Sequence, residues 1–345
     1  MSTTLDDASM PPASTASLPV PAAAPAATAV PALLAERPMA GGVGLLRYRP
    51  WRGQFQGPWR AVLAIARTGL AQLLRRKLFW GLYALSLLVF FLFFYGQYGL
   101  VWLQGQVQNQ PTAISPGVGA PKVQTGDLIR RLNDRWNLNG TGKTFRNFIW
   151  FEGQMVMIVL ALAGAVLVGN DFRFGTLPFY LSKPMSKWHY LLGKCLAVAF
   201  FVNLLTTLPA AILWVQYGLI TEWSYFYEQL GLLLGIVGYG LVLTVTFSLL
   251  LVATAVWLQR TAPLIMIWVA IFMLGPVLVS ILVDGLKFSE YWRLLDLWNN
   301  TYLVGSRCLG IEEPLWRSAA LTLAVLSAVC LAYLSRRIRA VEVVS

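Results

Sequence analysis

Long apolar runs constrain the fold of this chain more than any other feature. A helix of about 20 residues crosses a hydrocarbon core of about 30 Å, and six runs approach or exceed that length. They cover residues 78–102, 148–168, 195–215, 230–257, 263–283 and 318–334. Only 12% of the residues are charged, which is too few to cover the surface of a soluble domain. The sequence therefore predicts an all-α integral membrane protein with six transmembrane helices.

Basic residues are distributed unequally between the two sets of loops. Six spans place both termini on one side, and with the N-terminus inside, 17 of the 27 Lys and Arg residues lie on the inner side. The positive-inside rule then predicts a multi-pass protein of the cell inner membrane with both termini in the cytoplasm. This topology also explains the net charge of +12, so a nucleic-acid partner is not expected.

The segments that flank the spans have their own compositions. Residues 1–45 are rich in Pro and Ala and are expected to form a disordered cytoplasmic tail, because they cannot bury enough apolar surface. Residues 46–77 combine apolar and basic positions and are predicted to form an amphipathic interfacial segment, with an ordinary cytoplasmic linker as the alternative. The transmembrane domain follows at 78–339, and residues 340–345 form a short cytoplasmic tail.

The chain is poorly supplied with residues for catalysis or metal binding. His189 is its only histidine, and the three cysteines share no metal-ligand spacing; they are Cys195, Cys308 and Cys330. No catalytic residue and no metal site are expected. Residues 140–144 resemble the end of a phosphate-binding loop, but Asn137 stands where that loop requires its first glycine. The chain itself is therefore not expected to hydrolyse ATP.

The connection between the second and third spans is basic and rich in helix and turn signals. A short helix is expected to include Gly175, Thr176 and Leu177. Pro184 would end this helix, and Ser186 can cap the helix that leads into the third span. The pattern predicts a compact helical knob at the cytoplasmic face of the membrane.

This connection resembles the corresponding segment of type-2 ABC transporter permeases. The matching positions are Asp171, Gly175-Thr176-Leu177, Leu181-Ser182-Lys183-Pro184, Ser186-Lys187 and Gly193-Lys194. The resemblance implies a six-span permease with a preceding interfacial helix and a short cytoplasmic coupling helix that contacts an ATPase. The residues expected to couple are Asp171, Arg173, Gly175, Thr176, Leu177, Leu181, Ser182, Lys183, Pro184, Ser186 and Lys187. A generic basic loop is the alternative reading of the same residues.

The same resemblance implies a function and a set of partners. The chain would be the membrane subunit of an ABC exporter, not an enzyme by itself and without a cofactor of its own. Separate ABC ATPase subunits would bind ATP and magnesium, and a second permease chain would complete a homodimer in the lipid membrane. A scaffold or assembly factor that recruits a cytoplasmic partner without transporting a substrate is the alternative.

Four polar residues inside the second and third spans are candidates for a substrate path. Glu152 and Gln154 lie in the outer part of the second span, and Asn203 and Thr206 lie in the third. Solvation at the membrane interface would explain the first pair equally well, and hydrogen bonds to adjacent helices would explain the second. Pro209, Pro263 and Pro276 are candidate helix breaks or hinges, although prolines are also common in membrane helices. Residues 284–315 are predicted to form an interfacial hairpin or short re-entrant helices, with an ordinary amphipathic cap as the alternative.

Overall fold

A computed structural model describes most of the chain from residue 57 onward. The described residues are 57–109, 113–114, 123–124, 130–131, 133–134, 136–169, 171 and 186–338. All of them belong to one compact unit, Phe55–Ser345, and a separate unit, Met1–Gln54, lies outside the described residues. The predictions made for residues 1–45, 46–56 and 340–345 therefore lie outside them as well.

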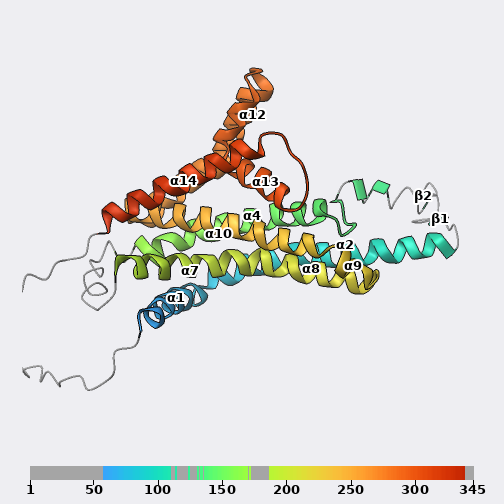
Figure 1. Ribbon diagram of the computed structural model, residues 1–345, viewed down its shortest axis with the longest axis horizontal. Helices are drawn as coiled ribbons and strands as arrows, with labels where there is room; N and C mark the ends of the chain where they lie inside the picture. The colour runs from blue at the N-terminus through green and yellow to red at the C-terminus, as the bar shows by residue number, and fades with distance from the viewer. Residues whose placement is uncertain are drawn as a thin grey trace, which may run out of the picture. The chain divides into compact units, whose positions relative to one another are not determined.

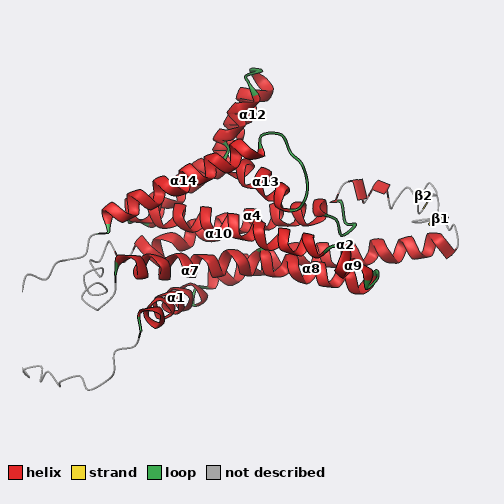
Figure 2. Cartoon of the chain, viewed as in Figure 1, coloured by secondary structure: helices red, strands yellow, loops and turns green. Residues whose placement is uncertain are grey.

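Six helical segments in the described ranges are long and apolar enough to cross a membrane. Their helices are α2 (Lys77–Asn109), α4 (Gly142–Gly164) with η1 (Ala165–Gly169), α7 (Lys187–Leu205) with α8 (Thr207–Ile220), α10 (Leu230–Leu258), α11 (Thr261–Val269) with η2 (Ala270–Leu274), α12 (Gly275–Ser280) and η3 (Ile281–Gly285), and α14 (Trp316–Arg337). The prediction of an all-α membrane protein with six transmembrane helices is confirmed, and helix dominates the chain in Figure 2.

A shorter helix precedes the first of these segments. α1 (Pro58–Leu74) begins with proline in its first turn, where a missing N–H costs no helical hydrogen bond. Its buried face includes Val62, Ile65 and Leu73, whereas Arg60 and Arg67 are exposed. α1 packs against α7, as Figure 1 shows. The apolar face of this amphipathic helix is therefore buried against another helix of the same chain.

The remaining elements lie between the long helices. They are β1 (Ala113–Ile114) and β2 (Val123–Gln124), which pair antiparallel, α9 (Ser224–Glu228), η4 (Glu290–Leu295) and α13 (Leu297–Cys308). The predicted hairpin or re-entrant segment at 284–315 thus contains two short helices, η4 and α13, before α14 begins. α13 contacts α4, α10 and α14, so it packs into the helical assembly.

Two of the long helical segments are interrupted close to a proline. Thr206 separates α7 from α8, and the ring of Pro209 would clash with the carbonyl of Leu205 in a continuous helix. The segment that contains α11 and α12 changes to a wider π-helical turn at Ala270–Leu274, immediately before Gly275 and Pro276. Since proline cannot donate a backbone hydrogen bond, the neighbouring turns adjust locally.

Candidate functional site

A buried ion pair lies at the foot of the connection between η1 and α7. Lys194 Nζ is 2.7 Å from Asp171 Oδ2, and the two side chains are only 5% and 15% exposed. The Tyr190 hydroxyl donates to the same carboxylate oxygen at 2.8 Å, and Lys194 also donates to the carbonyl of Leu167. Asp171 stands just beyond η1 and Lys194 stands on α7, so these bonds tie together both ends of the connection.

The environment of Lys194 explains why the pair can be buried. A charge removed from water is tolerated when an opposite charge and further hydrogen bonds replace its hydration. Lys194 has a carboxylate, a backbone carbonyl and the Tyr190 ring, whose centroid is 5.7 Å from Nζ. The pair therefore fixes where the chain leaves one membrane helix and enters the next.

Close packing by α1 supports this anchor from one side. A Cβ added at Gly193 would lie 2.9 Å from Ile65 Cβ, and one added at Gly69 would lie 2.9 Å from Leu167 Cδ2. Both glycines thus allow α1 to approach α7 and η1 more closely than a side chain would permit. The Gly193-Lys194 pair in the sequence combines this close approach with the buried charge.

The start of α7 makes two further contacts. Ser186 occupies the N-cap position as predicted, but its hydroxyl pairs with His189 Nδ1 at 2.6 Å and makes no side-chain bond to the helix backbone. Lys187 donates to the carbonyl of Ser335 at 3.2 Å, in the last turn of α14. A cation is favourable there because helix C-terminal carbonyls carry partial negative charge. The anchor is thereby linked to a third membrane helix.

The structure describes three of the predicted coupling residues, Asp171, Ser186 and Lys187. Arg173, Gly175, Thr176, Leu177, Leu181, Ser182, Lys183 and Pro184 lie outside the described residues. The structure brings Asp171 together with Tyr190 and Lys194. Sequence reasoning counted Lys194 among the positions that resemble the family, but it included neither Lys194 nor Tyr190 among the coupling residues. The i, i+4 spacing of Tyr190 and Lys194 was a usable signal, since such residues share a helix face.

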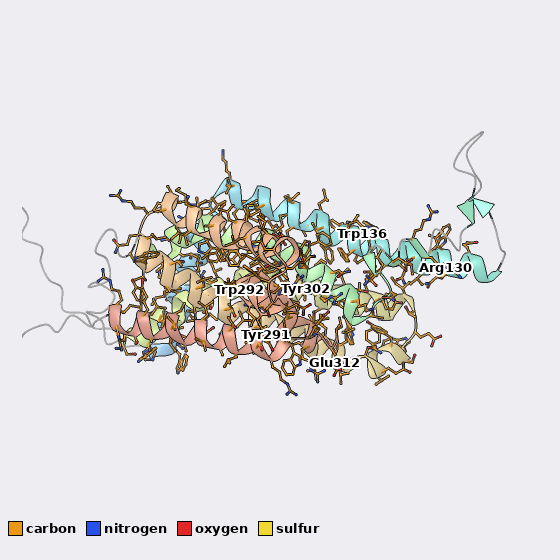
Figure 3. All side chains as sticks on the ribbon, turned by 90° about the horizontal axis from the view of Figure 1, so that it is seen from above. Arg130, Trp136, Tyr291, Trp292, Tyr302 and Glu312 are labelled. Atoms are coloured by element: carbon orange, nitrogen blue, oxygen red, sulfur yellow. The ribbon has the colours of Figure 1, made fainter. Side chains whose placement is uncertain are left out.

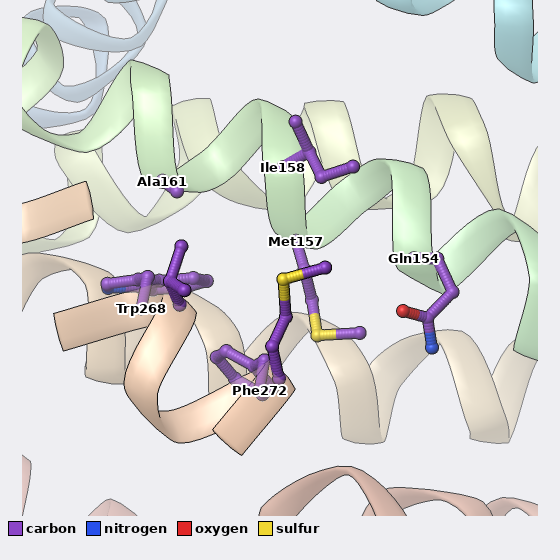
Figure 4. Close-up of a pocket in the computed structure, with 8 residues that line it drawn as sticks. Gln154, Met157, Ile158, Ala161, Trp268 and Phe272 are labelled. Carbon is purple, nitrogen blue, oxygen red and sulfur yellow. The ribbon is translucent and has the colours of Figure 1, made fainter. Parts of the chain in front are cut away.

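Glu152 and Gln154 occupy different environments on α4. Glu152 is fully buried and accepts a hydrogen bond from the Ser86 hydroxyl of α2 at 2.5 Å. Gln154 lines a small cavity with Met157 on the same helix and with Trp268 and Phe272 on α11 and η2, as Figure 4 shows. The cavity is otherwise apolar, so Gln154 supplies its polar group.

Asn203 and Thr206 make hydrogen bonds at the junction of α7, α8 and α10. Asn203 Nδ2 donates to Thr244 Oγ1 of α10 at 2.8 Å, and Thr207 donates to Asn203 Oδ1 at the same distance. The Thr206 hydroxyl donates to the carbonyl of Val202 at 2.7 Å. These bonds satisfy polar groups where Pro209 interrupts the helix.

A second ion pair lies near the C-terminal end of α13. Arg146 on α4 pairs with Glu313 at 2.9 Å, and its guanidinium lies 4.9 Å from the ring centroid of Tyr302, a residue labelled in Figure 3. Close packing accompanies the ion pair, because a Cβ at Gly142 would lie 2.4 Å from the carbonyl of Leu309. α13 is thus held against the start of α4 by charge and by a close glycine contact.

Asp296 caps the other end of α13, and its substitution gives a testable result. Its Oδ1 accepts hydrogen bonds from the backbone N–H groups of Trp298 at 2.9 Å and Asn299 at 3.1 Å. We expect Asp296→Ala to lower the free energy of unfolding by about 1 kcal/mol, whereas Asp296→Asn keeps the cap and most of that stability. Denaturant titration of the purified variants measures both; equal losses in Ala and Asn would contradict the capping role.

The burial of Asp296 also makes the stability of the protein depend on pH. Burial raises the pKa of the Asp296 carboxyl above its ordinary value. A raised folded-state pKa stabilises the protein below the unfolded-state pKa, and this contribution disappears as the pH rises through the folded-state value. Asp296→Asn should lack that component of the pH profile.

The part of the chain that the structure describes holds no group of three or more His, Cys, Asp or Glu residues able to bind a metal ion. In a comparison with known families, the model described as "ABC-2 family transporter protein" matches residues 63–291 of the 345-residue chain. The match runs from α1 to η4 and includes the anchor at Asp171, Tyr190 and Lys194. No curated protein matches the chain.

Proposed function

Because the chain belongs to the ABC-2 family of transporter proteins, we propose that it is the permease subunit of an ABC exporter driven by separate ATPase subunits. Export is inferred from the family relation alone. In this proposal the ATPase subunits bind ATP and magnesium, and the permease chain makes the path through the membrane. The structural observation that supports this proposal is the buried anchor formed by Asp171, Tyr190 and Lys194.

The anchor supports a mechanical role for the connection between α4 and α7. A segment that transmits motion must be held firmly where it joins the membrane helices, since a loose junction would absorb the displacement. Here one end is tied to the other through Asp171 and Lys194, and Lys187 adds a bond to α14. ATPase closure against this connection would then move α4, α7 and α14 together.

We further propose that two copies of the chain assemble above two ATPase subunits. Large apolar side chains on α2 are exposed, including Leu88, Leu92 and Tyr95. Lipid covers such a surface, and part of it can pack against a second copy. A homodimer would bring two coupling connections to the same side of the membrane, one for each ATPase subunit.

Photo-crosslinking tests the ATPase contact directly. A benzophenone side chain at Ser186, which is exposed beside the connection, is expected to form an adduct with an ABC ATPase in cells. The control carries the same group at Glu312, whose side chain is 88% exposed near the opposite end of the helices. An absence of ATPase adducts at 186, or equal adducts at both positions, would favour a scaffold that recruits another partner.

The proposed membrane topology predicts from which side of the membrane a maleimide can reach cysteines introduced at exposed positions. In a variant with Cys195, Cys308 and Cys330 replaced by Ala, a cysteine at Glu312 should react with an impermeant maleimide in intact spheroplasts. A cysteine at Arg336, which is also exposed, should react only after permeabilisation, because the basic ends are assigned to the cytoplasm. The reverse pattern would invert the assigned orientation.

A further inference from the structure

A pocket opens between the end of α1, the start of α2, α4 and the first residue of α11. Its volume is about 210 Å³. Six apolar residues and two polar ones line it: Leu73, Leu78, Phe79, Leu82, Val159 and Leu162, with Arg76 and Thr261. A volume this large exceeds the roughly 30 Å³ of one water molecule, and the apolar walls offer few partners to a water cluster. The pocket suits a ligand with an apolar body.

Positive charge gathers at the same place. Arg75 and Arg76 lie between α1 and α2, Lys77 is the first residue of α2, and Arg260 directly precedes Thr261. All four side chains are exposed, and in the described part of the chain none of them has a carboxylate within ion-pair distance. Uncompensated basic residues beside an apolar pocket are complementary to a ligand that joins an anionic group to hydrocarbon.

We propose that this pocket binds one anionic phospholipid. Its phosphate contacts Arg76 and the neighbouring basic residues, while part of an acyl chain lies against Phe79, Val159 and Leu162. A free anion would leave the apolar walls uncovered, and a neutral lipid would leave the basic residues without a counter-charge. Trp80, 54% exposed and donating its indole N–H to the carbonyl of Leu74, is typical of the headgroup level.

The site requires no ATPase, so its test is separate from that of the proposed function. Native mass spectrometry of the full chain in neutral detergent would compare phosphatidylglycerol with phosphatidylcholine of identical acyl chains. We expect the anionic lipid to bind preferentially, and Arg76→Gln to weaken its binding about fivefold, as expected for one basic residue at a membrane surface. The matched control is Arg60→Gln, an exposed arginine at the other end of α1.

Two additional measurements separate a lipid site from a plain anion site. Leu162→Trp narrows the pocket without changing its charge and should also weaken phosphatidylglycerol binding. Glycerol 3-phosphate is water-soluble and carries the same kind of anionic group without acyl chains. When it is added at the concentration at which phosphatidylglycerol saturates the site, it should not displace the bound phosphatidylglycerol. Equal binding of the two lipids, equal effects of Arg76→Gln and Arg60→Gln, or displacement by glycerol 3-phosphate would each overturn the proposal.

Discussion

Replacing Lys194 by Met should lower the free energy of unfolding by about 3–5 kcal/mol, the usual cost of removing one partner from a buried ion pair. Asp171 would keep its largely buried carboxylate without the ammonium that lies 2.7 Å away. The methionine also loses the bond to the carbonyl of Leu167. Unfolding in mixed micelles measures the stability. If the proposed complex with an ATPase forms, its rate of ATP hydrolysis measures the coupling, and this rate should fall together with the stability.

A matched control lies seven residues earlier on the same helix. Lys187 donates to one carbonyl at the end of α14 and has no carboxylate partner in the described structure, so Lys187→Met should cost only about 0.3–1 kcal/mol. The double variant Asp171→Asn, Lys194→Met should recover part of the loss, because it removes both charges. Equal stability of the two single methionine variants would show that the ion pair does not anchor the connection.

Replacing Gly153 by Leu should destabilise the contact between α4 and α13 by about 1–3 kcal/mol or more through overpacking. A Cβ at this position would lie 2.0 Å from the Trp298 ring, which is itself buried and stacked on Phe247. The leucine would therefore displace α13. Unfolding midpoints in detergent measure the stability, and ATP hydrolysis by the proposed complex with an ATPase measures any effect on the proposed coupling.

Gly231 provides the control for this substitution. It lies on α10, and a Cβ there would meet nothing within 4 Å. Gly231→Leu should be neutral or slightly stabilising, since glycine within a helix costs about 1 kcal/mol relative to good helix formers. Adding Trp298→Leu to Gly153→Leu should restore part of the stability. If the two glycine variants behaved alike, α13 would not be closely packed on α4.

The spans were predictable because their signal is local. Length and apolar composition decide which segments cross a membrane, and each predicted run lies within a helical segment of the structure. The interruption after Leu205 was also predictable, because a continuous helix cannot accommodate the ring of Pro209. Family resemblance directed attention to Asp171 and to the Gly193-Lys194 pair, although it did not indicate that Asp171 and Lys194 meet.

The hydrogen-bond and ion-pair partners at the site depend on how segments far apart in the sequence pack together. The hydrophobic periodicity of the sequence does not reveal this packing. Tyr190 was not among the predicted coupling residues, yet its hydroxyl donates a hydrogen bond to Asp171. Asn203 was a candidate for the substrate path, and its amide bonds to Thr244 forty-one residues later. Gly153 gave no signal, because its role follows from the position of Trp298 on another helix. Such pairings require three-dimensional coordinates.

The most direct test of the central proposal is the ATP hydrolysis rate of the native complex and of its separated parts. The chain would be purified from its own membranes with any associated subunits, then stripped of them in high salt. The proposal predicts hydrolysis by the complex, none by the stripped permease chain, and renewed hydrolysis on adding back the ATPase subunit, with less stimulation by Lys194→Met. Hydrolysis by the stripped chain, or purification without any ATPase subunit, would contradict it.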